Sequence, residues 1–279
     1  MEIHILEAGT FMTRGEEMFC GLENVDWQKH YAPEKNGLCL WAMRCLLIID
    51  EDRKILIDTG PGTKLNQQTI DDYHIAGTHL LEKAMAEKNI AFDDISHVIL
   101  SHLHFDHCGG STIVSDNGEI VPAFRNAKIF ISKKQWNYAL SPVESDKESY
   151  RKIDFIPLKK SNRIIFVEHE HEILPNISVK FVDGHTPGQM IPFIKRKKET
   201  IVFAADLLPS AAHIEKNYIM SYDLSPQKSN REKRAFLNEA VKNNYKIIFQ
   251  HDKEVYSSSL SKIIQFGSGF RIIKQCLSS

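Results

Sequence analysis

Histidine and aspartate gather in one short stretch of this sequence. His102, His104, Asp106 and His107 follow directly on the apolar run Val98-Ile99-Leu100, separated from it only by a serine. Two residues apart in an extended chain, His102 and His104 point the same way and can bind one cation. Asp106 and His107, at the turn into a helix, can then bind a neighbouring cation. Imidazole and carboxylate without thiolate favour zinc, and they also suit iron, manganese or cobalt.

Three more residues of these types also follow strand-like apolar runs. His185 comes after the run 179–182, Asp206 after 201–205 and His251 after 245–250. Where strands alternate with helices, strand ends gather along one edge of a sheet, and ligands bind there. We therefore expect seven ligands to converge on two divalent cations. One site would hold His102, His104 and His185, the other Asp106, His107 and His251, and Asp206 would bridge them.

Two such cations predict hydrolytic chemistry. They lower the pKa of a shared water, so that a metal-bridging hydroxide can attack a carbonyl or phosphoryl centre. The small positive charge left by two divalent cations, two aspartates and a hydroxide suits an oxyanion developing on the substrate. Asp106 is the candidate catalytic residue, because it can carry a proton to the leaving group.

The elements that position these residues alternate between strand and helix. Residues 45–49 and 55–57 predict a hairpin of buried strands, and the apolar face of residues 75–89 predicts a helix. Further helices are expected at 133–140, capped by Ser132, and from Pro226 to about residue 243. Gly109 and Gly110 would let the backbone bend after His107, and the first forty residues read as strand plus long loop.

Composition sets wider limits. The chain has 279 residues, 42% apolar and 25% charged, with a formal net charge of -1. We expect a single globular domain over residues 1–279, acting on a small molecule and binding neither nucleic acid nor a membrane. The five cysteines form no C-x-x-C pair, and the chain begins without a basic and apolar leader. These features predict a cytoplasmic protein.

The motif at residues 102–107 resembles the H-x-H-x-D-H signature of the metallo-β-lactamase superfamily. The segments 58–60 (Asp-Thr-Gly), 183–188, 204–206 and 250–251 are similar to that family's other metal-site segments. The resemblance implies an α/β fold, a four-layer αββα sandwich with the site at one edge between the two sheets. It also implies that Asp58 supports the metal site without binding the metal, and that a homodimer can form.

Residues 205–209 and the lengthy N-terminal segment look most like the branch with N-acyl-homoserine lactonases and methyl parathion hydrolase. Some of these lactonases carry a tyrosine three residues after the bridging aspartate, where this chain has Pro209. Tyr218 or Tyr222 could take over assistance to the substrate carbonyl. The main hypothesis is a dinuclear metal-dependent hydrolase acting on an ester, lactone or phosphoester-type substrate.

Two alternatives are weighed against hydrolysis. The same scaffold can hold iron in dioxygenases and oxygen reductases, but no flavin domain fits in this length, and the ligand set is fuller than a mononuclear dioxygenase needs. A non-catalytic binding module would be expected to lose ligands, which this chain has not.

Several other residues favour structural explanations. Alternation in Glu168–Glu172 places His169 and His171 on a surface strand. Cys108 is expected to be a small buried residue rather than a ligand or nucleophile. His213 could line the substrate pocket or face solvent. The N-terminal aromatic residues are expected in a core or a dimer contact.

Overall fold

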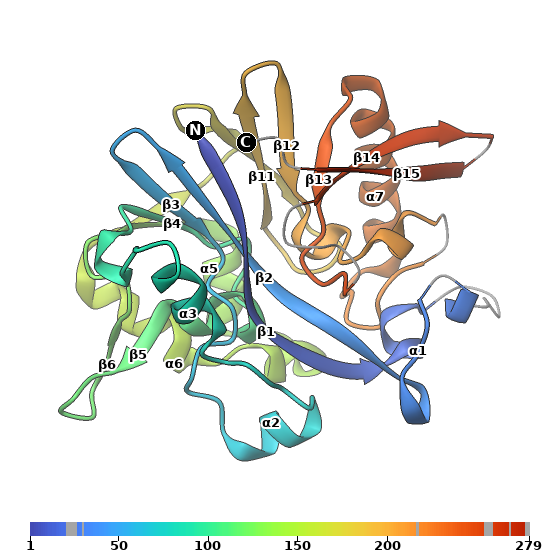
Figure 1. The fold of residues 1–279 in the computed structure, drawn as a ribbon. Coiled ribbons are helices and arrows are strands. Elements are labelled where there is room, and N and C mark those ends of the chain that lie inside the picture. Colours follow the sequence, from blue (N-terminus) through green and yellow to red (C-terminus); the bar gives the residue numbers. More distant parts are fainter. Residues whose placement is uncertain (21–26, 30, 216–217, 254–258, 268, 277–279) are drawn as a thin grey trace. The chain divides into compact units, whose positions relative to one another are not determined.

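A computed structural model describes residues 1–20, 27–29, 31–215, 218–253, 259–267 and 269–276 (Figure 1). The chain forms two compact units. Unit 1 comprises Met1–Phe11 and Ala42–Glu168, and unit 2 comprises Met12–Trp41 and His169–Ser279. A single domain over all residues stays a prediction.

The strands are β1 (Glu2–Arg14), β2 (Leu38–Asp50), β3 (Arg53–Ile57), β4 (His97–Ile99), β5 (Thr112–Val114), β6 (Ile120–Pro122), β7 (Lys128–Ser132), β8 (Ile164–Val167), β9 (His171–Leu174), β10 (Ile177–Val182), β11 (Gln189–Arg196), β12 (Glu199–Phe203), β13 (Lys246–Ile248), β14 (Ser259–Phe266) and β15 (Gly269–Cys276). The α-helices are α1 (Gly15–Met18), α2 (Gln67–Asp72), α3 (Leu80–Ala86), α4 (Phe105–Cys108), α5 (Lys133–Leu140), α6 (Lys152–Phe155) and α7 (Pro226–Asn243). The 3-10 helices are η1 (Trp27–Lys29), η2 (Lys35–Gly37), η3 (Phe92–Asp94), η4 (Gly109–Ser111), η5 (Glu144–Ser149), η6 (Ile156–Ser161), η7 (Ala205–Leu207) and η8 (Ala211–Ile214).

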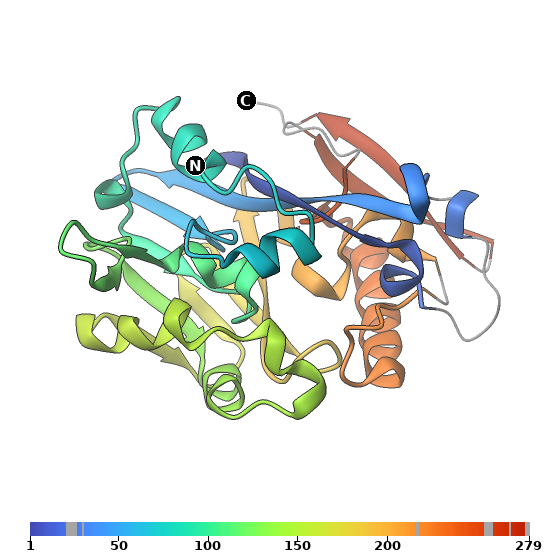
Figure 2. The same cartoon turned by 90° about the horizontal axis from the view of Figure 1, so that it is seen from below.

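The six-stranded sheet lies mostly in unit 1, in the order β1-β2-β3-β4-β7-β8. Its long strands β1 and β2 run side by side (Figure 2). The predicted hairpin is confirmed, with β2 antiparallel to β3. The other neighbouring pairs in this order after β3, which are β3-β4, β4-β7 and β7-β8, are parallel. Because β3 and β4 run the same way, the residues after them, Asp58 and Ser101, reach the same edge of the sheet.

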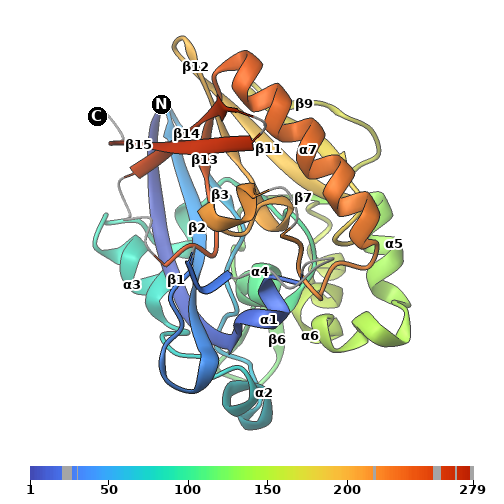
Figure 3. The ribbon, with the colours of Figure 1, turned by 90° about the vertical axis from the view of Figure 1, so that its right-hand side faces the viewer.

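The sheet of unit 2 has seven strands in the order β15-β14-β13-β12-β11-β10-β9. β12 is parallel to β13, and β10 points the same way as β12 because each is antiparallel to β11. The segments after these three strands therefore meet at one edge. Helix α7 lies along the sheet (Figure 3), where Phe236 packs on Phe193 and Glu239 pairs with Lys180.

Two of the three predicted helices have the expected bounds. α5 begins after Ser132, whose Oγ accepts a hydrogen bond from the Gln135 amide at 3.2 Å, and α7 covers Pro226–Asn243. The helix expected at 75–89 is confirmed only in part, because α3 covers Leu80–Ala86 and neither the first five nor the last three of the expected residues. Ala76 instead pairs with Thr10 of β1, and Gly77 has a φ of +70°, which no helix allows.

Across these described ranges, no helix is both long enough and apolar enough to span a lipid bilayer.

Candidate metal centre

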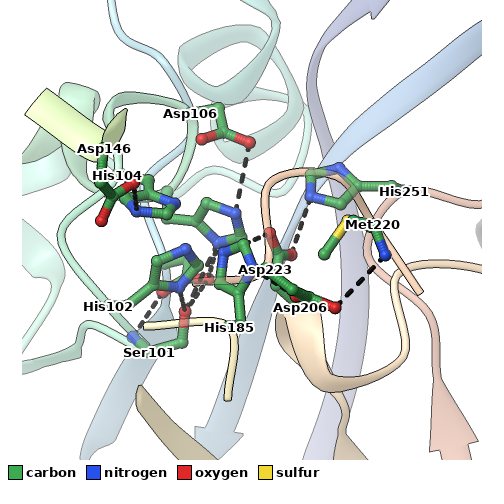
Figure 4. Close-up of polar contacts among 12 residues, drawn as sticks. Ser101, His102, His104, Asp106, Asp146, His185, Asp206, Met220, Asp223 and His251 are labelled. Carbon is green, nitrogen blue, oxygen red and sulfur yellow. Dashed lines mark hydrogen bonds and ion pairs between the residues drawn. The ribbon is translucent and has the colours of Figure 1, made fainter. Parts of the chain in front are cut away.

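Unit 1 brings together the four residues of the 102–107 motif. His102 and His104 lie next to each other (Figure 4), with ring centroids 4.5 Å apart. The ring centroid of His107 lies 3.8 Å from that of His102, and all three side chains are buried. Helix α4 carries Asp106 and His107, and Asp106 Oδ2 lies 3.2 Å from His107 Nε2. The histidines and the aspartate that sequence spacing divided between two cations thus occupy one compact cluster.

Asp58 lies behind this cluster and is fully buried. Its carboxylate accepts hydrogen bonds from the Ser101 amide and hydroxyl, both at 2.7 Å. Asp58 Oδ2 is also 3.0 Å from His107 Nδ1. A carboxylate at Nδ1 keeps the imidazole proton there and leaves Nε2 to bind a cation. This geometry fits the supporting role that the family resemblance implies for Asp58.

The glycines after His107 allow two backbones to touch. The Thr59 amide donates to His107 O at 2.8 Å, and the Gly110 amide donates to Gly60 O at 2.9 Å. A Cβ on Gly109 would lie 2.1 Å from Pro61 O, and one on Gly110 would lie 2.2 Å from Thr59 O. Gly109 has an ordinary helical φ of -56°, so close approach, rather than the bend expected from the sequence, requires glycine here.

A buried ion pair fixes the same turn. Lys64 Nζ donates to the carbonyls of Gly109 and Thr112 at 2.5 and 2.6 Å and lies 3.2 Å from Asp154 Oδ1. Burial lowers the pKa of Lys64 and raises that of Asp154, and each charge opposes the shift of the other. Sequence reasoning did not identify this pair, because its two members lie in segments without a metal-site motif.

Unit 2 places Asp206 between two histidines. Asp206 Oδ2 lies 3.2 Å from His185 Nε2, and Asp206 Oδ1 lies 3.0 Å from His251 Nε2. All three side chains are buried. A carboxylate whose two oxygens each face a different imidazole nitrogen has the geometry of a ligand shared by two cations. The donor set of this unit therefore fits divalent metal ions, as the sequence predicts for these residues.

Two acidic residues that the sequence did not point to also contact the histidines. Asp223 Oδ1 lies 3.0 Å from His185 Nδ1, and Asp146 Oδ1 lies 3.4 Å from His104 Nε2. Tyr150 packs edge-on against the His104 ring, with centroids 4.8 Å apart. Neither aspartate follows an apolar strand, so the signal that identified the other residues is absent at both positions.

Both tyrosines considered as helpers are held by neighbours. Tyr222 Oη lies 3.0 Å from Thr13 Oγ1 and 3.0 Å from Glu17 Oε2. Tyr218 is buried edge-on against Phe19, and its carbonyl accepts a hydrogen bond from Lys233. Burial lowers the pKa of Lys233 to about 8. Assistance to a substrate carbonyl by either tyrosine stays a prediction.

His213 is buried, so the alternative in which it faces solvent is wrong. Its Nε2 lies 2.7 Å from Met18 O, its Nδ1 lies 2.7 Å from Ser210 Oγ, and its ring stacks on Phe19 at 4.6 Å. Burial lowers its pKa to about 3. His213 and Asp206 both line a cavity of about 10 Å³, which is too small for a substrate.

The structural explanation for Cys108 is confirmed, and so is the surface position of His169 and His171, although only His171 lies in a strand, at the start of β9. Cys108 is buried and donates to Leu103 O at 3.4 Å, and burial raises its pKa well above the usual range, which keeps the thiol unreactive. His169 and His171 are exposed, with ring centroids 4.7 Å apart.

Comparison with known proteins adds a family and a fold. A sequence model of the metallo-beta-lactamase superfamily matches residues 44–267. The N-acyl homoserine lactonase AiiA of Bacillus thuringiensis subsp. kurstaki is 28% identical over 184 residues. A Bacillus cereus N-acyl homoserine lactonase is 27% identical over the same length. In both cases the match covers 62% of this chain and 65% of the relative, so about a third of each relative's length lies outside it.

Solved structures match over nearly the whole chain. A probable metal-dependent hydrolase from Staphylococcus aureus superposes with a TM-score of 0.87 at 24% identity, covering 98% of this chain and 96% of its own. AidC, a dizinc quorum-quenching lactonase, superposes with a TM-score of 0.81 at 21% identity, covering 99% and 95%. The α/β fold that the sequence predicts is confirmed.

Proposed function

The chain belongs to the metallo-beta-lactamase superfamily, and from that premise we propose that it is a metal-dependent hydrolase of small molecules. The observation that carries the proposal is Asp206, whose two carboxylate oxygens face His185 and His251 separately. One carboxylate shared in this way is expected at a site for two cations, and two divalent cations can activate a water for hydrolysis.

We propose that the metal-binding residues of both units serve the same pair of cations. The candidate ligands are His102, His104, Asp106 and His107 of unit 1 and His185, Asp206 and His251 of unit 2. His102, His104 and His185 would bind one ion, and Asp106, His107 and His251 would bind the other. Zinc is the proposed metal, supported by the nitrogen and oxygen donors and by the dizinc lactonase of similar fold.

Bound divalent cations would supply an activated water as nucleophile and a positive charge for the developing oxyanion. The chain's own residues divide the remaining work. The three histidines of the motif are buried, whereas the side chain of Asp106 is 16% exposed. Asp106 can therefore reach a leaving group and hand it a proton.

The proposed substrate is a lactone, an ester or a phosphoester. Support comes from the curated relatives, which are N-acyl homoserine lactonases. A cytoplasmic location and a homodimer stay predictions from the sequence. The described cysteines Cys20, Cys39, Cys45 and Cys108 are free thiols, which is compatible with a reducing compartment.

The test combines metal analysis with a substrate screen. The purified protein should contain about two zinc ions per chain, hydrolyse N-hexanoyl homoserine lactone, lose turnover after chelation and regain it with added zinc. Asp106→Asn should lower kcat by about 100-fold or more, whereas Asp116→Asn, at an exposed position of unit 1, should match the wild type. Full turnover without metal would overturn the proposal. Iron with oxygen consumption would replace it with redox chemistry.

A further inference from the structure

The loop that carries His185, residues 183–188, is held along its backbone by α7 and the segment before it. The Glu232 carboxylate accepts the amides of Asp183 at 3.0 Å and Gly184 at 2.8 Å. The Ser225 amide donates to Gly184 O at 2.8 Å. A Cβ on Gly184 would lie 2.3 Å from the Ser229 amide nitrogen, so the loop packs directly on the first turn of α7.

The imidazole of His185 has a carboxylate at each of its two nitrogens. Its Nδ1 lies 3.0 Å from Asp223 Oδ1, and its Nε2 lies 3.2 Å from Asp206 Oδ2 (Figure 4). Asp223 is itself fixed, because its Oδ2 accepts the Met220 amide at 3.3 Å. The side chains of His185 and Asp223 are only 3% and 5% exposed, so water does not compete for this contact.

A neutral imidazole carries its proton on one nitrogen and a lone pair on the other. An ionised carboxylate can only accept, so Asp223 stabilises the tautomer with the proton on Nδ1 and leaves the Nε2 lone pair directed at the oxygen of Asp206. Asp58 has the same relation to His107, at 3.0 Å from Nδ1. The two carboxylate-to-Nδ1 distances are the same, 3.0 Å, yet only Asp58 lies in a recognisable motif.

We propose that Asp223 is a positioning residue of the metal centre: it fixes the tautomer of His185 that can bind a cation. The inference rests on the proposed metal site. Outer carboxylates of this kind typically change metal affinity by about 10–100-fold when removed. Asp223→Asn is the sharpest change, because its amide can donate to Nδ1, move the imidazole proton to Nε2 and so block the metal-binding nitrogen.

Glu232→Gln provides the matched control. Glu232 holds the same loop through two backbone amides, does not contact the His185 ring, and a glutamine keeps one oxygen to accept those amides. Loss of a negative charge beside the loop would affect both variants, whereas loss of the tautomer would affect only Asp223→Asn.

The experiment measures zinc affinity of chelator-stripped wild type, Asp223→Asn and Glu232→Gln by competition with a chromophoric chelator. Nitrogen-15 NMR of the metal-free proteins reports which nitrogen of His185 is protonated. We expect Asp223→Asn to weaken one zinc-binding step by about 10–100-fold and to move the proton to Nε2, while Glu232→Gln stays within about 2-fold of wild type. Thermal unfolding of the metal-free proteins checks that both variants fold.

If Asp223→Asn does not fold, Asp223→Glu and Asp223→Gln give a second comparison, since they differ only in carboxylate against amide, and the glutamate should bind zinc more tightly. Wild-type affinity in Asp223→Asn, or equal weakening in both loop variants, would overturn the inference alone. A wild type that binds no divalent cation would overturn the proposed function as well.

Discussion

His213 should make this protein measurably less stable as the pH is lowered. The Met18 carbonyl can only accept, so His213 Nε2 carries the proton and donates to it at 2.7 Å, while Nδ1 accepts from Ser210 Oγ at 2.7 Å. The neutral ring is thus fully satisfied inside the aromatic cluster of Phe19, Trp41 and Tyr218. Adding a proton there places a charge in a dry, apolar environment.

The size of the effect follows from the two pKa values. Burial lowers the pKa of His213 from 6.5 to about 3 in the folded protein. Below pH 6.5 the unfolded chain takes up a proton that the folded chain refuses, so the contribution to stability is complete above pH 6.5 and is lost as pH falls toward 3. At about 1.4 kcal/mol per pKa unit, the loss is about 2 kcal/mol at pH ~5 and about 4–5 kcal/mol at pH ~3.

The assay is urea unfolding of metal-free wild type and His213→Phe at pH ~7 and ~5. At pH ~7 the variant should be less stable than wild type by about 1–3 kcal/mol, because the Met18 carbonyl loses its donor. Between the two pH values, however, wild type should lose about 2 kcal/mol more than the variant. His79→Phe, at an exposed position, should follow wild type. Equal pH dependence in wild type and His213→Phe would refute the reasoning.

Three further predictions concern the metal centre and its supports. Gly109→Ala should lose about 1–3 kcal/mol in urea unfolding, because its Cβ meets Pro61 O at 2.1 Å. Gly269→Ala, whose Cβ would meet only Phe266 O at 3.8 Å, should cost less, and equal costs would show that the turn at Gly109 relaxes. Lys64→Met should lose about 3 kcal/mol, because buried Asp154 then keeps only Arg151, whose Nε lies 3.8 Å from Asp154 Oδ2. Adding Asp154→Leu should recover part of the loss, and no recovery would contradict this account. Zinc at about 100 times its Kd should stabilise the wild type by about 2.7 kcal/mol in the same assay, and an unshifted transition would count against metal binding.

Apolar runs that are followed by a histidine or an aspartate are the most informative part of the sequence. The run before Asp206 forms β12, and the run before His251 contains β13. The two strands are parallel, so both residues reach one edge, as expected. This inference succeeds because strand period and strand end are local properties of the chain. The first part of the helix expected at 75–89 was predicted wrongly for the opposite reason. Ala76 pairs with Thr10, and this long-range contact cannot be predicted from a local pattern.

The supporting carboxylates show the same limit. Asp58 could be identified because it ends a strand within a familiar motif, whereas Asp146 and Asp223 lie in segments whose position depends on packing. Asp223 is 38 residues from the histidine it contacts. The sequence shows the glycines at positions 109 and 110 but not why they are required. Their close approach to the carbonyls of Pro61 and Thr59 is seen only in the folded backbone.

The make-up of unit 2 has a consequence for biosynthesis. Residues 12–41 leave the ribosome early, yet the groups they pack against come much later: Phe19 stacks on His213, and Tyr31 Oη accepts the Lys253 amide at 3.2 Å. A nascent chain must therefore carry Phe19, Tyr31 and Trp41 without their contacts to His213 and Lys253 until most of the protein has been translated. Those exposed rings are where a chaperone would bind, and where truncated chains would aggregate.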